Sequence, residues 1–143
     1  MITVLMGAPG AGKSTWVSQN SNNEHLFNTE GVRVNREMDI ASYMHFQRVK
    51  AIKAVESGKS LIADGTHTIT THRLVWLNLA KRLELPTKLV IFKVNLDILL
   101  AVQKTRQHPA PNKVVIDHYT RLKKAELIAR NEGWDEIIYA QRF

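Results

Sequence analysis

The sequence predicts a single α/β domain, in which helices cover the faces of a parallel β-sheet. A chain of 143 residues, 44% of them apolar, is the size of one globular domain with one core. Along the chain, short apolar runs alternate with longer segments of helical spacing, the pattern of strand–helix–strand units. The sequence contains no internal repeat, low-complexity tract or linker that would divide it. One α/β domain therefore accounts for the whole chain.

Five segments are expected to be strands because they are short and mostly apolar, as strands buried in a parallel sheet are. They are residues 2–6, 32–34, 60–63, 88–94 and 135–139. The polar, asparagine-rich stretch 20–31 is expected to be a loop that leads into the second strand.

Five segments have the spacing of helices. They are residues 13–19, 39–57, 71–85, 96–106 and 114–131. Their predicted ends coincide with residues that stop helices. Gly58 and Gly133 follow the second and fifth segments, Pro86 follows the third, and Pro109 and Pro111 break the chain after the fourth. Strands and helices thus alternate in chain order.

The most informative motif lies between the first strand and the first helix, where residues 7–14 satisfy the Walker A pattern G-x-x-x-x-G-K-[ST]. The residues predicted to bind nucleotide are Gly7, Ala8, Pro9, Gly10, Ala11, Gly12, Lys13, Ser14 and Thr15. The glycines permit a tight turn that presents backbone N–H groups to phosphate oxygens, and the helix N-terminus adds positive charge. Lys13 can reach the β- and γ-phosphates, and the Ser14 hydroxyl can complete a Mg²⁺ shell. The sequence therefore predicts binding of a nucleoside triphosphate.

Three acidic residues follow predicted strands, where a parallel α/β sheet places its ligands. Asp64 ends the third strand, so we expect it to help hold Mg²⁺ as a Walker B carboxylate, the alternative being a turn or helix-capping residue. Glu37 and Asp39 follow the second strand, and either could activate an acceptor hydroxyl as a general base. The alternative for this pair is a favourable charge at a helix start.

Basic residues provide candidates for both substrates. Arg106 closes the fourth helix and is predicted to lie in a lid over the triphosphate, where its charge would stabilise the transferred phosphoryl group. The alternative for Arg106 is a cation that offsets a helix dipole. The residues expected to bind the acceptor are Arg36, Arg48, Thr66, His67 and Arg73. The residues expected to be solvated helix faces are Lys81, Arg82, Arg121, Lys123 and Lys124. The tryptophans Trp16, Trp76 and Trp134 are expected in or near the core.

Composition limits the classes of function. A formal charge of +7 and a pI near 9.9 favour a polyanionic partner such as nucleic acid. The chain has no cysteine, which excludes a thiolate metal site or a cysteine nucleophile and suits a reducing compartment. The sequence shows neither a signal peptide nor the roughly 18 consecutive apolar residues of a membrane span. We therefore expect a cytoplasmic protein that does not bind membranes.

The chain resembles the P-loop kinases of the 5′-hydroxyl polynucleotide kinase type, known from phages and eukaryotes. The resemblance extends over nearly the whole chain and rests on residues 7–16, 34–37, 62–67 and 100–115. It implies a four- to five-stranded parallel sheet with the active site under a helical lid. It also implies transfer of the γ-phosphate of ATP to the 5′-hydroxyl of DNA or RNA.

The chain departs from that family at several positions. The family's general base, an aspartate, falls on Glu37, and the arginine that contacts the acceptor's 3′-phosphate in phage enzymes falls on Ile40. The lid arginine falls on Arg106, but a second lid arginine would fall on Val102 and is absent. The family's Asp-x-Thr-Asn segment ends here in His67. The resemblance therefore supports γ-phosphoryl transfer more strongly than it supports one acceptor.

From the sequence we expect an ATP- and Mg²⁺-dependent kinase that acts on a hydroxyl of nucleic acid, with the 5′-hydroxyl end as the first choice. One alternative is a kinase for a small molecule or a modified base, such as a nucleoside-like or hydroxymethylated acceptor. A more remote one is an ATP-binding module without catalysis.

Overall fold

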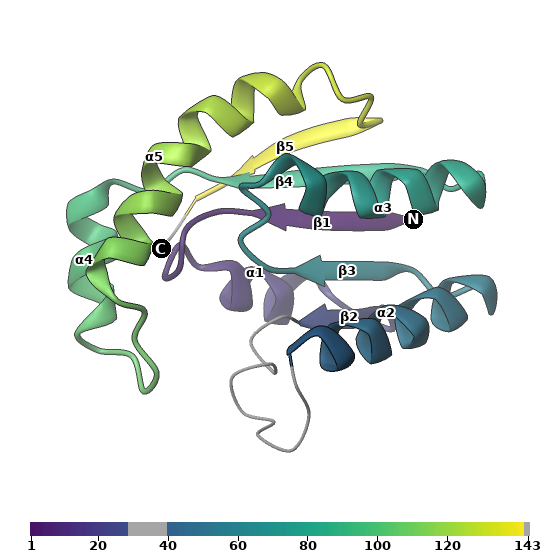
Figure 1. Ribbon diagram of the computed structural model, residues 1–143, viewed down its shortest axis with the longest axis horizontal. Helices are drawn as coiled ribbons and strands as arrows, with labels where there is room; N and C mark the ends of the chain where they lie inside the picture. The colour runs from purple at the N-terminus through teal and green to yellow at the C-terminus, as the bar shows by residue number, and fades with distance from the viewer. Residues whose placement is uncertain (29–39, 142–143) are drawn as a thin grey trace.

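The computed structural model describes residues 1–28 and 40–141, and the statements below concern these residues (Figure 1). In chain order, the elements are β1 (Ile2–Met6), α1 (Lys13–Asn20), β2 (His25–Asn28), α2 (Ile40–Glu56), β3 (Leu61–Asp64), α3 (Thr70–Arg82), β4 (Thr87–Phe92), α4 (Leu96–Gln103), α5 (Asn112–Ala129) and β5 (Glu136–Ala140). No described helix is long and apolar enough to cross a membrane.

The strands form one sheet in the order β2-β3-β1-β4-β5, and every neighbouring pair is parallel. Strand β1 is central, with Ile2 paired to Leu61 of β3 on one side and to Thr87 of β4 on the other. All five residues of β1 are buried, as its continuous apolar run predicts for a strand covered on both faces. The predicted fold class, a parallel sheet flanked by helices, is confirmed.

Helices cover both faces of the sheet, and the alternation of side chains along β1 divides the core into two clusters. Ile2, Val4 and Met6 face the cluster that α2, α3 and most of α5 complete. Leu5 faces the other cluster, which includes residues of α1 and α4. In Figure 1, α2 and α3 lie in front of the sheet and α1 lies behind it.

Helix α5 connects the two layers. Val115, near its start, packs in the cluster with α1 and α4, whereas Leu122, Ala125 and Ala129 pack in the cluster with α2 and α3. In Figure 1, the first half of α5 lies beyond the arrowheads of the strands. This path brings side chains of α5 to the carboxyl ends of the strands, the edge at which parallel sheets bind ligands.

Two predicted boundaries are wrong in an informative way. Residues 20–31 do not form one loop, because His25–Asn28 pair with β3 as an edge strand; the predicted strand at 32–34 lies outside the described residues. The third helix ends at Arg82 instead of residue 85, because Glu84 adopts a left-handed conformation with φ 53°.

Two of the three tryptophans, Trp76 and Trp134, are buried, as predicted. Trp16 is half-buried and packs edge-on against Phe92.

Candidate active site

The loop between β1 and α1 has the backbone conformation that its glycines permit. Gly10 and Gly12 have φ of 88° and 96°, in the left-handed region that favours glycine. Gly7 passes close to β4, and a Cβ at this position would lie 2.8 Å from the Cβ of Phe92. The ammonium group of Lys13 donates hydrogen bonds to the carbonyls of Gly7 and Ala8, at 2.9 and 2.8 Å. A cation is therefore held at the loop.

The N-terminus of α1 is suited to an anion. Its N-cap residue is Gly12, so no side chain caps the first N–H groups, and the first turn contains no acidic residue. Ser14 and Thr15 lie exposed in this turn. The backbone N–H groups and the helix dipole together favour negative charge at this point.

Asp64 lies at the carboxyl end of β3, next to β1 in the sheet, and is buried. The loop after it is tied to the phosphate loop by a hydrogen bond from the N–H of Gly7 to the carbonyl of half-buried Thr66, at 3.0 Å. No group of three or more His, Cys, Asp or Glu side chains in the described part of the chain could hold a metal. The carboxylate of Asp64 and the hydroxyl of Ser14 are the kind of oxygen groups that could hold Mg²⁺, which takes only one or two ligands from a protein when phosphates supply others.

A residue that the sequence analysis missed, Gln103, connects the phosphate loop to the segment after α4. Its side chain is buried, and its Nε2 donates to the carbonyl of Pro9 at 2.9 Å. Its Oε1 accepts from the N–H of Ala110 at 3.0 Å and from Nη1 of Arg106 at 3.3 Å. Arg106 is thereby connected to the phosphate loop through Gln103. A glutamine at the end of an apolar helix gives no signal of such a role in the sequence.

The structure corrects the role predicted for His67. Its imidazole is buried and does not face a substrate, because Nδ1 donates to the carbonyl of Leu5 at 2.8 Å and Nε2 accepts from the indole of Trp76 at 3.2 Å. Burial lowers the pKa of His67 to about 4, so the ring is neutral. His67 is a structural residue that fixes the loop after β3, where its own φ is 46°.

The structure also corrects the role predicted for Arg73, which was expected to bind the acceptor. Its side chain is fully buried and forms two hydrogen bonds with Glu132, at 2.9 and 2.8 Å, so it cannot reach an acceptor. Nη1 donates to the carbonyl of His67 at 3.0 Å. Although burial raises the pKa of Glu132, the hydrogen bonds from Arg73 and Trp134 bring it below its usual value. The ion pair holds Arg73 in place, and the hydrogen bond from Arg73 to the carbonyl of His67 stabilises the loop after β3.

Helix α5 contributes to a polar cluster around Arg121, which the sequence analysis expected on a solvated helix face. The Oγ1 of Thr68 lies 2.8 Å from Nδ1 of His118, and Nη1 of Arg121 donates to both atoms, at 3.2 and 3.3 Å. Burial, followed by the charges of Arg121 and Lys13, lowers the pKa of His118 to about 4. The cluster lies near the phosphate loop, because Thr68 follows two residues after Thr66, whose carbonyl accepts from the N–H of Gly7.

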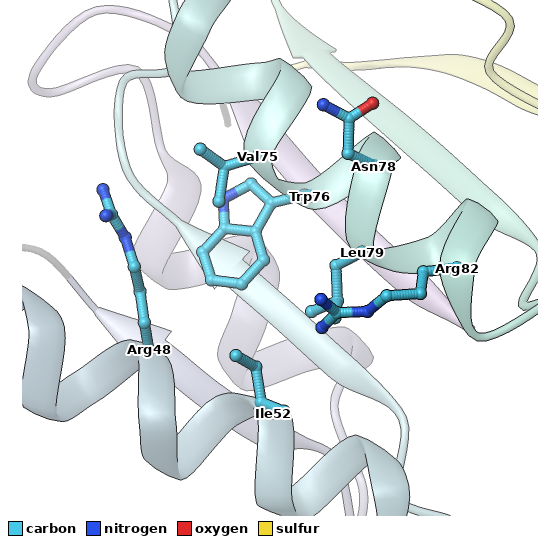
Figure 2. A pocket seen from close by; sticks show the side chains of 7 residues that line it. All are labelled: Arg48, Ile52, Val75, Trp76, Asn78, Leu79 and Arg82. Carbon is cyan, nitrogen blue, oxygen red and sulfur yellow. The ribbon is translucent and has the colours of Figure 1, made fainter.

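Arg48 lies on α2 and borders a groove of about 350 Å³ between α2 and α3 (Figure 2). Figure 2 shows Arg48 at one end of this groove and Arg82 at the other, with the indole of Trp76 between them. The remaining predicted residues, Arg36, Glu37 and Asp39, lie outside the described residues.

Comparison with known proteins places this geometry in a family. A family model described as an AAA domain matches residues 2–126. The chain belongs to this family. Its fold is that of a P-loop kinase-like domain, which implies nucleotide binding and indicates a phosphotransferase.

Three solved structures have a similar fold. A chain of the Pnkp1/Rnl/Hen1 RNA repair complex superposes with a TM-score of 0.75 at 16% identity, covering 89% of this chain. Kti12 from Chaetomium thermophilum, in complex with ADP-AlF3, has a TM-score of 0.63 at 12% identity, covering 99% of this chain and 89% of its own. Deoxyadenosine kinase from M. mycoides has a TM-score of 0.53 at 17% identity, covering 99% of this chain and 90% of its own.

At these identities the likeness concerns the fold. The present chain spans 45% of the length of the matched chain in the RNA repair complex, so the other activities of that complex do not transfer with the fold.

Proposed function

We propose that the protein is an ATP- and Mg²⁺-dependent kinase that transfers the γ-phosphate to a hydroxyl of nucleic acid, the 5′-hydroxyl end of DNA or RNA. The observation that carries the proposal is the pairing of two cations at one phosphate loop. Lys13 lies on the loop itself, and Arg106 is connected to the same loop through Gln103. In a P-loop kinase-like fold, charges from two sides of the loop can stabilise a transferring phosphoryl group.

In this proposal each residue has one role. The backbone of the phosphate loop and the N-terminus of α1 bind the β- and γ-phosphates. Ser14 and Asp64 would hold Mg²⁺, which would supply positive charge to the phosphates when bound. The acceptor oxygen attacks the γ-phosphorus, ADP leaves with the bridging oxygen, and the hydroxyl proton passes to Glu37 or Asp39.

Two observations support nucleic acid as the acceptor. The chain has a formal charge of +7, and Arg121 lies beside the loop after β3 while Arg48 lines the groove between α2 and α3. Of the three structures compared above, the chain of an RNA repair complex has the highest TM-score, 0.75. The deoxyadenosine kinase fold supports a nucleoside-like hydroxyl compound as the second candidate acceptor.

The test is transfer of labelled γ-phosphate from ATP to an oligonucleotide with a 5′-hydroxyl end, beside the same oligonucleotide with a 5′-phosphate. Labelling of the 5′-hydroxyl strand alone is expected, and Lys13→Ala should abolish it because phosphate charge is no longer neutralised. If neither strand is labelled while ATP still binds, the polynucleotide proposal fails. Nucleosides and modified bases would then be tested, and no turnover with any acceptor would indicate a binding module.

The general base is tested separately. Glu37→Gln and Asp39→Asn keep the size of each side chain and remove its ability to accept a proton. The variant that lacks the base should lose about 10²- to 10⁴-fold in kcat. Full turnover in both variants would contradict the assignment of the base to this pair.

A further inference from the structure

Helices α5, α2 and α3 carry three arginines to which the proposed function assigns no individual role. The first is Arg121 of α5, whose position is fixed. Its guanidinium donates to Thr68 and His118, so it is tied to the loop after β3. Because an arginine can only donate, Nδ1 of His118 must be an acceptor, and the neutral ring then carries its proton on Nε2. Arg121 and the Nε2–H group of His118 are therefore donors at the edge of the phosphate-loop site.

The second arginine, Arg48 of α2, lies farther along α3. Arg121 is bonded to Thr68, two residues before α3 begins, whereas Arg48 lines the groove together with Val75 in the second turn of α3. His72 lies between these two places in the first turn of α3, and burial, followed by the charges of Arg48 and Arg121, lowers its pKa.

The third arginine, Arg82, lies at the end of α3. It lines the same groove as Arg48, and the floor between them is apolar (Figure 2). Ten residues of helix separate Arg82 from His72, a rise of about 15 Å. Stacked nucleotides in one strand are spaced by about 3.4 Å, so this length corresponds to about four nucleotides.

We propose that Arg121, Arg48 and Arg82 form a cationic track that binds the phosphodiester backbone of a single-stranded nucleic acid acceptor and leads its end into the phosphate-loop site. This inference rests on the proposed function and specifies its substrate. The acceptor is a strand of at least four to six nucleotides, not a mononucleoside. The apolar floor of the groove would contact sugars and bases without reading their sequence.

The test measures binding directly, so that it does not depend on transfer. Fluorescent single-stranded oligodeoxynucleotides of two, four, six and twelve nucleotides are titrated into the protein at several salt concentrations. Affinity should rise up to about six nucleotides and then level off. Arg121→Gln, Arg48→Gln and Arg82→Gln should each reduce the salt slope by about 0.7, which corresponds to about 5-fold in affinity near 0.1 M salt.

Two variants provide matched controls. Lys81→Gln removes the neighbouring charge on α3, and Lys123→Gln removes an exposed charge on α5; neither residue lines the groove or joins the Thr68 cluster. Both should leave binding unchanged. An equal loss in all five variants would indicate diffuse attraction and overturn the track, as would a dinucleotide that binds as well as the longest strand.

The transfer assay separates this inference from the proposed function. If 5′-hydroxyl ends are phosphorylated equally well at every strand length and in every arginine variant, the kinase proposal stands and the track is wrong. If no strand is phosphorylated but binding depends on the three arginines, the track stands and the kinase proposal is wrong. Unchanged ATP affinity and thermal midpoint in the variants would show that each variant is folded.

Discussion

The buried imidazole of His67 predicts that the protein loses stability as the pH falls below about 6.5. The neutral ring satisfies both nitrogens, with Nδ1–H directed at the carbonyl of Leu5 and Nε2 directed at the N–H of Trp76. A second proton would place an N–H group against the indole N–H and would charge a side chain that is 5% exposed. Burial therefore lowers the pKa of His67 to about 4 in the folded protein.

The sign and size of the effect follow from proton linkage. Between pH 6.5 and about 4 the unfolded chain binds this proton and the folded chain does not. The free energy of unfolding is therefore highest above pH 6.5 and falls as the pH is lowered through this range. The loss attributable to His67 is about 2 kcal/mol at about pH 5 and approaches about 3 kcal/mol below about pH 4.

Urea denaturation near pH 7 and near pH 5 measures this loss in the wild type and in His67→Asn. Asparagine does not titrate, and it tolerates the left-handed backbone that His67 adopts, φ 46°. The variant will be less stable at both pH values because it loses packing and hydrogen bonds. Its stability should nevertheless fall by about 2 kcal/mol less than that of the wild type between these pH values.

Exposed His108 provides the matched control, and His108→Asn should follow the wild-type pH dependence. Parallel curves for wild type and His67→Asn would refute the reasoning. Nitrogen NMR provides an independent check, because the hydrogen bonds require a neutral ring at pH 6 with its proton on Nδ1.

Two further predictions concern the loop and its support. Gly10→Ala should lower both ATP affinity and thermal stability, the latter by about 1–3 kcal/mol, because Gly10 has φ 88° and its new Cβ would lie 2.7 Å from Nε2 of Gln103. Gly58→Ala, at φ 93° with open space around it, should show the backbone cost without loss of ATP affinity. Glu132→Gln should cost about 3–5 kcal/mol in urea denaturation, because it leaves the buried guanidinium of Arg73 without its carboxylate.

The control for the buried pair is a surface pair. Glu136→Gln removes the exposed partner of Lys88, at 3.7 Å, and should cost less than about 1 kcal/mol. Equal losses in Glu132→Gln and Glu136→Gln would contradict the importance of burial. Retained ATP affinity in Gly10→Ala would contradict the close packing of the phosphate loop against α4.

The sequence by itself determined the fold class and the nucleotide-binding loop. Both depend on residues that are neighbours in the sequence. The apolar run of β1 predicts a strand buried on two faces, and the glycines beside Lys13 predict a tight turn before a helix. The helix ends near Gly58 and Gly133 were likewise predicted, because a glycine stops a helix through its own backbone.

The tertiary structure decided where polar side chains lie. Strand β2 escaped prediction because it is an edge strand in which only Phe27 is buried, so it lacks a strong apolar pattern. Arg73 and His67 were expected to bind the acceptor, but each is buried and bonded to a partner that is distant in sequence, Glu132 at a separation of 59 residues and Leu5 at 62.

The contacts that build the site are equally remote. Gln103 meets Pro9 across 94 residues of sequence, and Arg121 meets Thr68 across 53. A polar side chain is stable in the interior only when a partner satisfies its hydrogen bonds, and in a parallel sheet the order of the strands brings such partners together. A pattern confined to a few neighbouring residues contains no information about contacts between residues that are distant in sequence. The side chains that hold the site in place could therefore be identified only in the folded chain.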